Sequence, residues 1–184
     1  MALLGNKGGP TGLLGIILVF FVVFAGAPNE APIADAAQDN DISAVRELLR
    51  QGADPNAAQA DGLTALHWSA LNNDMEIVDI LLFAGANPSS TSRLGGYTPL
   101  HMASRAGHSD IAGKLLEAGA DPNRFTSTGV TSMHFAAESN SSELIQVLVA
   151  AGGDINSLDA YSSRTPLMFA STRNAVAAVE TLID

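Results

Sequence analysis

Histidine is the residue type in this sequence best suited to acid–base or metal chemistry, because the 184 residues include four His and no Cys. His67, His101 and His134 stand 34 and 33 residues apart, and His108 is the fourth. A zinc site draws its ligands from short local spacings that converge on a tetrahedron, and this spacing is far wider. The histidines are therefore predicted to be structural, and we expect no metal site.

Other short motifs also favour structural explanations. Asp39-Asn40-Asp41 begins like a calcium loop, but Ser43 and the missing Gly and Glu indicate a turn and a helix N-cap instead. The glycines around Gly5 lack the Gly-Lys-Ser/Thr ending of a phosphate-binding loop. Asn140-Ser141-Ser142 is a glycosylation sequon, which matters only where the host glycosylates exported chains. We therefore expect no catalytic residues, no cofactor and no enzyme activity of the chain itself.

The charge balance bears on the kind of partner. Nine Lys and Arg stand against nineteen Asp and Glu, which gives a formal net charge of −10. Nucleic-acid binding needs clustered cations to neutralise phosphates, so nucleic acid is not expected as a partner. A protein partner with a basic surface is expected instead.

The first 27 residues have the pattern of an export signal. Lys7 precedes an unbroken apolar run over 13–24, and small residues at 25–27 follow it. The run is shorter than the roughly 20 residues that a membrane-spanning helix needs. We expect a cleaved signal peptide with a mature start at Gly26 or Pro28, or else an uncleaved N-terminal membrane anchor. Both alternatives place 28–184 outside the cytoplasm, periplasmic, secreted or tethered.

The rest of the chain repeats with a period of 33 or 34 residues. One marker has the form Thr-Pro-Leu-His or a close variant, and a second is a Gly-Ala-Asp-Pro-Asn-like segment. The first marker begins at Thr64, Thr98, Thr131 and Thr165, and the second begins at Gly52, Gly85, Gly119 and Gly152. An amphipathic apolar pattern precedes each glycine and returns in register at the end of the chain.

These markers resemble the ankyrin-repeat family over residues 31–184. The resemblance implies an all-α solenoid in which each unit has two helices and a β-turn or hairpin. It also implies that His67, His101 and His134 belong to the hydrogen-bond network between adjacent units. The expected units are 31–63, 64–97, 98–130, 131–164 and an incomplete 165–184. The first unit lacks Thr and His, the fourth has Ser132 in place of Pro, and the fifth has Met168 in place of His.

The residue types agree with this architecture on physical grounds. Thr can cap a helix N-terminus, and Pro99 and Pro166 suit the first helical position. The glycines of the second marker suit the left-handed residue that ends a helix. One such unit cannot bury its own apolar face, so stability is expected to come from stacking.

The resemblance further implies protein binding through hairpin tips and the exposed, concave side of the first helices. The candidate partner-binding residues are Arg93, Leu94, Tyr97, Arg105, Phe125, Glu138 and Tyr161. We expect the first three and Phe125 to stand out from adjacent hairpins, with packing against the neighbouring hairpin as the alternative for Tyr97 and Phe125. Trp68, Phe135 and Phe169 are expected in the core.

The expected function is that of a non-catalytic protein-interaction module. The alternative is the ankyrin portion of a larger exported enzyme or redox protein that continues beyond residue 184, and a membrane-tethered scaffold is a third possibility. No polar capping unit follows Asp184. We therefore expect the outer face of the last unit to be covered by further chain or to dock onto another surface.

Overall fold

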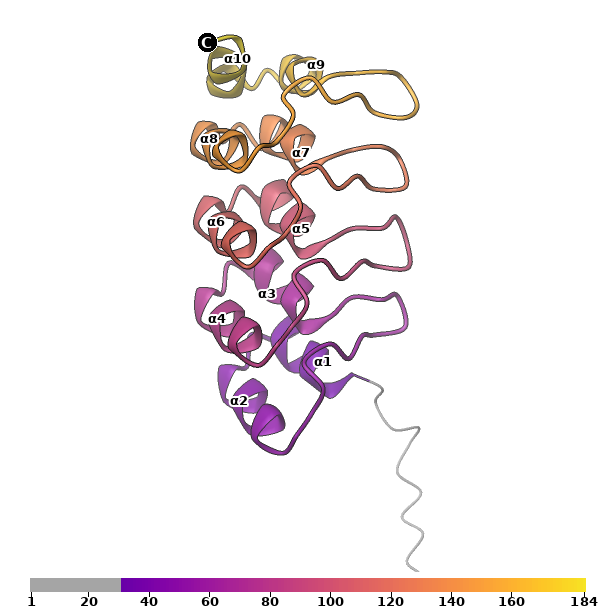
Figure 1. Ribbon diagram of the computed structural model, residues 1–184, viewed down its shortest axis with the longest axis vertical. Helices are drawn as coiled ribbons and strands as arrows, with labels where there is room; N and C mark the ends of the chain where they lie inside the picture. The colour runs from indigo at the N-terminus through magenta and orange to yellow at the C-terminus, as the bar shows by residue number, and fades with distance from the viewer. Residues whose placement is uncertain (1–30) are drawn as a thin grey trace, which may run out of the picture.

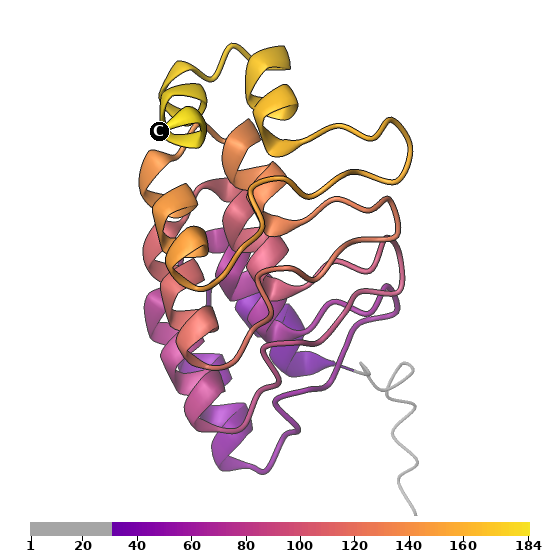
Figure 2. The ribbon, with the colours of Figure 1, turned by 45° about the horizontal axis from the view of Figure 1, so that its top comes forward.

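A computed structural model describes residues 31–184, and over this range the chain forms a stack of helix pairs with no strands (Figure 1). A loop joins each pair to the next, and these loops project to one side of the stack (Figures 1 and 2). The helices are α1 (Pro32–Gln38), α2 (Ile42–Arg50), α3 (Ala65–Asn72), α4 (Met75–Phe83), α5 (Pro99–Ala106), α6 (Ser109–Glu117), α7 (Ser132–Glu138), α8 (Ser142–Ala150), α9 (Pro166–Thr172) and α10 (Val176–Ile183). The all-α solenoid predicted from the repeat is confirmed for this range.

The Thr of the first marker starts the first helix of a pair. Thr98 is the N-cap of α5, and Pro99 occupies the first turn, where its missing N–H costs no hydrogen bond. The backbone N–H of Thr98 donates to Nδ1 of His101 at 3.0 Å, which completes a capping box. Thr64 with His67, and Thr131 with His134, form the same box in α3 and α7.

The Gly of the second marker ends the second helix of a pair. Gly119 has φ of +96°, a value that a Cβ would disfavour. Its N–H donates to the Leu116 carbonyl, and the Ala120 N–H donates to the Leu115 carbonyl, each at 3.0 Å. This pair of bonds is the Schellman motif, and it recurs at Gly52, Gly85 and Gly152.

A left-handed residue also marks the turn between the two helices of each pair. The residues with positive φ at this turn are Asn40, Asn73, Gly107, Asn140 and Asn174. Asn and Gly tolerate this conformation best, which explains why these types recur here. Asp41 follows the first of these turns as the predicted N-cap of α2, and its side chain accepts from the Ala44 N–H at 2.9 Å.

The core lies between the first and second helices of the stack. Ala70, Ala103 and Ala136 are fully buried on successive first helices, and their small side chains let these helices pack closely. The second helices contribute larger aliphatic side chains, such as Ile77, Leu115 and Leu148, which are also fully buried. In the last pair, Met168, Val176 and Ile183 remain exposed.

The projecting loops are joined to one another by backbone hydrogen bonds. The N–H groups of Arg93, Ser127 and Ala160 donate to carbonyls of the preceding loop at 2.7, 2.8 and 2.9 Å. Gly62 has no room for a Cβ, because that atom would lie 2.6 Å from the Arg93 backbone nitrogen. This close stacking aligns corresponding positions of successive loops into rows.

The predicted export segment, 1–27, lies outside the described residues. Within 31–184, no helix is both long enough and apolar enough to cross a bilayer.

Candidate binding surface

Three of the four histidines join the first helix of a unit to the loop that leads into the next unit. In each, Nδ1 faces the backbone N–H of the capping Thr, and Nε2 donates to a carbonyl of the following loop. The acceptors for His67, His101 and His134 are the carbonyls of Tyr97, Arg124 and Arg164, at 3.0, 2.9 and 3.0 Å. This arrangement uses both nitrogens of a neutral ring. Both ring nitrogens of these three histidines are therefore engaged in hydrogen bonds within the stack.

The surroundings of these rings oppose their protonation. Burial lowers the pKa of His67 and His134 below the usual 6.5, and it lowers the pKa of His101 to about 4. His108 lies on the turn before α6, and its Nε2 bonds to the Leu71 carbonyl at 3.1 Å. No group of three or more His, Asp or Glu side chains within 31–184 is placed to hold a metal ion.

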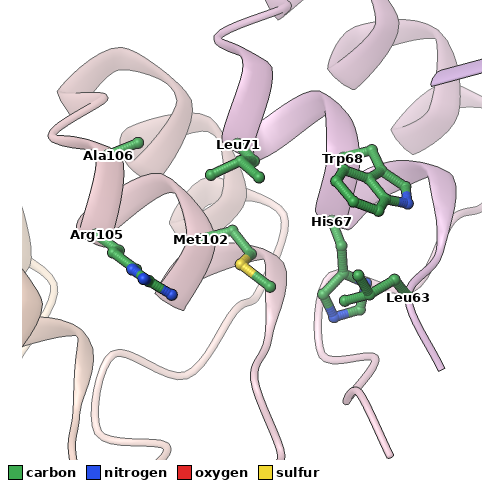
Figure 3. Close-up of a pocket in the computed structure, with 7 residues that line it drawn as sticks. All are labelled: Leu63, His67, Trp68, Leu71, Met102, Arg105 and Ala106. Atoms are coloured by element: carbon green, nitrogen blue, oxygen red, sulfur yellow. The ribbon is translucent and has the colours of Figure 1, made fainter. Parts of the chain in front are cut away.

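A hollow of about 410 Å³ lies between α3 and α5 (Figure 3). Its volume falls within the range of roughly 300–1,000 Å³ that is usual for ligand sites. Its walls are mostly apolar, with one cation at the edge. The lining residues are Leu63, His67, Trp68, Leu71, Met102, Arg105 and Ala106. Figure 3 shows the α5 residues on one side of the hollow, with Leu63, His67 and Trp68 opposite them.

Trp68 forms a wall of this hollow and is held in place by hydrogen bonds. Its indole Nε1–H donates to Oε1 of Gln59 at 2.8 Å. The amide of Gln59 in turn donates to the Asp35 carboxylate and to Oε1 of Gln38, both on α1. The indole is thus fixed by the preceding unit, which reduces the ordering cost of packing a ligand against it.

Arg105 stands at the edge of the hollow, and no carboxylate within 31–184 forms an ion pair with it. Five other cations within 31–184 are in ion pairs with carboxylates. These pairs are Arg46–Glu76, Arg50–Glu47, Lys114–Asp79, Arg164–Asp159 and Arg173–Glu138. Like Arg105, Arg93 and Arg124 have no carboxylate of residues 31–184 at ion-pair distance.

Large apolar side chains are exposed on successive loops. Leu94, Phe125, Leu158 and Tyr161 are 75%, 67%, 57% and 81% exposed. Phe125 and Leu158, from neighbouring loops, line a second hollow of about 460 Å³. Exposed apolar clusters of this kind mark interaction sites more often than isolated apolar residues do.

Three candidate residues have contacts within the molecule. Tyr97 was expected to stand out from its hairpin, but it is half-buried, and its ring packs against Phe135 and His101 with centroids 6.0 and 6.3 Å away. Tyr97 thus packs within the stack, against residues of α5 and α7 rather than against a neighbouring hairpin, while Phe125 is exposed. The Arg93 guanidinium donates to the Ala60 carbonyl at 3.0 Å, and Glu138 is paired with Arg173.

Part of the first hollow was not predicted from the sequence. Trp68 was expected in the core but is half-buried and faces the hollow, whereas Phe135 is buried as expected and Phe169 is half-buried. Met102 and Leu63 were not singled out. A signal was present, since a bulky apolar residue follows the His position in four units. These residues are Trp68, Met102, Phe135 and Phe169.

Comparisons with known proteins agree with the architecture. The family model described as ankyrin repeats (3 copies) matches residues 33–126 and 123–184. The chain is 38% identical over 146 residues, 78% of its length, to the palmitoyltransferase ZDHHC13 of Homo sapiens. It is 40% identical over 76 residues, 41% of its length, to the palmitoyltransferase Hip14 of Drosophila melanogaster. It is also 41% identical over 88 residues, 48% of its length, to the glycerophosphocholine phosphodiesterase gde1 of Schizosaccharomyces pombe.

The matched stretches are a small part of these relatives. They cover 23% of the human protein, 12% of the Drosophila protein and 8% of the yeast protein. The similarity therefore concerns the repeats rather than the activities in the names of the relatives. Because the family model matches most of the chain and the helix pairs follow its period, this chain belongs to the ankyrin-repeat family.

Proposed function

We propose that this chain is a non-catalytic module that binds a protein partner through its loops and the exposed side of its first helices. The observation that carries this proposal is the set of exposed apolar side chains on successive loops, Leu94, Phe125, Leu158 and Tyr161. The apolar hollow between α3 and α5 supports it further. Interface hot spots are typically a few such anchors within a polar rim.

Phe125→Ala is expected to weaken partner binding by more than about tenfold while leaving the melting curve almost unchanged. Truncating an interface anchor typically costs about 2 kcal/mol or more of binding energy. Surface substitutions usually change folding stability by less than about 0.5 kcal/mol. Proteins captured by the tagged chain are identified by mass spectrometry, and their affinities for the two forms are then measured by calorimetry.

Phe83→Ala is the matched control for this experiment. Phe83 is 96% exposed at the end of α4, where it lines a hollow with residues of the second helices α2, α4 and α6. A partner whose binding is weakened by Phe125→Ala but not by Phe83→Ala uses the loop surface. Equal effects of the two substitutions on every captured protein would contradict the proposal.

The net charge favours a partner with a basic surface. A chain with a formal charge of −10 attracts such a partner at long range and raises its association rate. The rate at which the partner associates with the chain should therefore fall as salt is added to the binding assay.

We also propose that the module is exported and lies outside the cytoplasm. The apolar run over 13–24 with small residues after it supports a signal peptide, cleaved before Gly26 or Pro28, or an uncleaved anchor. Intact-mass analysis of the protein from fractionated cells is expected to find it outside the cytoplasm. Full-length protein with Met1 or Ala2 at its start in the soluble cytosolic fraction would overturn this proposal.

A second candidate function follows from the relatives. Their names describe enzymes, and the part matched by this chain is 8–23% of each. The repeats would then bring partners or substrates to a catalytic domain elsewhere in a longer protein. Sequencing the transcript past the codon for Asp184 distinguishes the two, since an unrelated catalytic domain there favours the second.

A further inference from the structure

The hollow between α3 and α5 has a counterpart one unit further along, between α5 and α7. There the side chain of Tyr97 fills the corresponding space. Leu63 and Tyr97 each directly precede the capping Thr of a unit, and Met102 and Phe135 each directly follow a repeat His. Tyr97 packs its ring against Phe135. Leu63 and Met102 are smaller, and both line an open hollow.

The internal packing of Tyr97 therefore indicates what fits this hollow. Its ring lies 6.0 Å from the Phe135 ring and 6.3 Å from the His101 ring, measured between centroids. At the place that corresponds to the Tyr97 ring, the hollow is lined by His67, Met102 and the indole of Trp68. Imidazole and indole faces and a thioether are favourable partners for an aromatic ring.

The charge at the edge of the hollow specifies a second feature of the ligand. Arg105 has no carboxylate partner among residues 31–184, although the chain has about twice as many acidic as basic residues. The ion-paired cations of the second helices include Arg46 and Arg50 on α2 and Lys114 on α6, and their carboxylates lie on α2 and α4. Arg105 is thus free to pair with a carboxylate that a ligand brings.

We propose that the hollow binds an extended segment of a protein partner that inserts an aromatic side chain beside Trp68 and Met102. A carboxylate one or two residues away on the same segment pairs with Arg105. This inference rests on the proposed protein-binding function and assigns a ligand class to one site within it. The basic surface expected of the whole partner acts at long range, whereas the single carboxylate acts at contact.

Trp68 provides a site-specific probe, because it is the only tryptophan in the chain. The probe ligands are four acetylated and amidated hexapeptides, Gly-Ser-Phe-Glu-Gly-Ser and versions with Phe replaced by Ala, Glu by Gln, or Glu by Lys. Titration of each is followed by the nitrogen-15 NMR signal of the indole Nε1–H. The Phe-Glu peptide is expected to shift this signal and to bind at least about tenfold more tightly than the Ala-Glu peptide, as burial of a phenyl ring implies.

Two substitutions test the two halves of the proposal. Arg105→Gln should remove a preference of about fivefold for Phe-Glu over Phe-Gln, whereas Arg124→Gln, an unpaired arginine outside the hollow, should leave that preference in place. Leu63→Tyr should fill the hollow from within and weaken Phe-Glu binding by at least about tenfold. Circular dichroism of each variant confirms that the stack is folded.

Several outcomes would overturn this inference. Equal affinities of the Phe-Glu and Ala-Glu peptides, or an unchanged affinity in Leu63→Tyr, would exclude an aromatic side chain in the hollow. A Glu preference that survives Arg105→Gln would exclude the ion pair. If these results were found while Phe125→Ala still weakened binding of a captured partner, the ligand assignment would fail and the proposed function would stand.

Discussion

Lowering the pH from 7 to 4.5 is expected to remove roughly 3 kcal/mol or more of the free energy of unfolding. The largest contribution comes from His101, whose pKa falls from 6.5 to about 4, mainly because the ring is buried. A pKa difference of this size corresponds to about 3 kcal/mol between the neutral and protonated rings. That is a large part of the roughly 5–15 kcal/mol by which domains are usually stable.

The sign follows from the direction of the shift. Above pH 6.5 the imidazole is neutral in both the folded and the unfolded chain, so the full stability is present. As the pH falls below 6.5, the unfolded chain takes up a proton that the folded chain binds only near pH 4, and stability is lost. His67 and His134 have lowered pKa values for the same main reason, so they add to the loss.

Neighbouring charges modify this effect at His101 without reversing it. The Arg124 carbonyl, which accepts from Nε2, raises the pKa, as does the charge of Asp121. The charges of His67 and Arg124 lower it. Protonation of Nδ1 would also place a new N–H against the Thr98 N–H, which now donates to that nitrogen at 3.0 Å.

Urea unfolding followed by circular dichroism at pH 7.5, 6.5, 5.5 and 4.5 measures the loss. His101→Gln is the informative variant, because Gln can take the third helical position of a capping box but does not titrate. The variant is expected to lose stability less steeply between pH 6.5 and 4.5 than the parent chain. Identical pH profiles for the two proteins would show that the acid sensitivity arises elsewhere.

The sequence predicted the architecture because its signals are local and recur in register. Thr98, His101 and Gly119 each make hydrogen bonds that depend on positions within a few residues, so their spacing alone locates helix ends. Repetition of these signals then identifies the stack, since each unit meets only its neighbours.

The binding surface was less predictable because exposure depends on the neighbouring unit. Phe125 and Tyr97 both belong to loops and are both aromatic, yet one is exposed and the other packs against Phe135. Met102 and Phe135 both follow a repeat His, yet Met102 lines a hollow with the small Leu63 whereas Phe135 packs against the larger Tyr97. These differences depend on pairs of residues about 38 positions apart along the chain, which a single unit's pattern does not reveal.

Phe135→Ala is expected to lower the free energy of unfolding by about 3–5 kcal/mol, the usual cost of truncating a buried aromatic side chain. Phe135 is only 8% exposed, and its ring packs against Tyr97 at 6.0 Å and against His101 at 5.8 Å between centroids. These two contacts join α7 to α5 and to the loop before α5, so the substitution also weakens the interface in the middle of the stack.

The matched comparison is Phe125→Ala, which removes the same side chain from an exposed loop position ten residues away along the chain. For a domain of this length, each kcal/mol shifts the melting temperature by about 2–4 °C, so Phe135→Ala should lower it by roughly 6–20 °C. Phe125→Ala should change stability by less than about 0.5 kcal/mol. Scanning calorimetry of the two variants measures both effects. Similar melting temperatures for the two would contradict the packing of Phe135 between the units. A large loss in Phe125→Ala would instead show that its ring supports the stack, and the loop surface would then lose its proposed anchor.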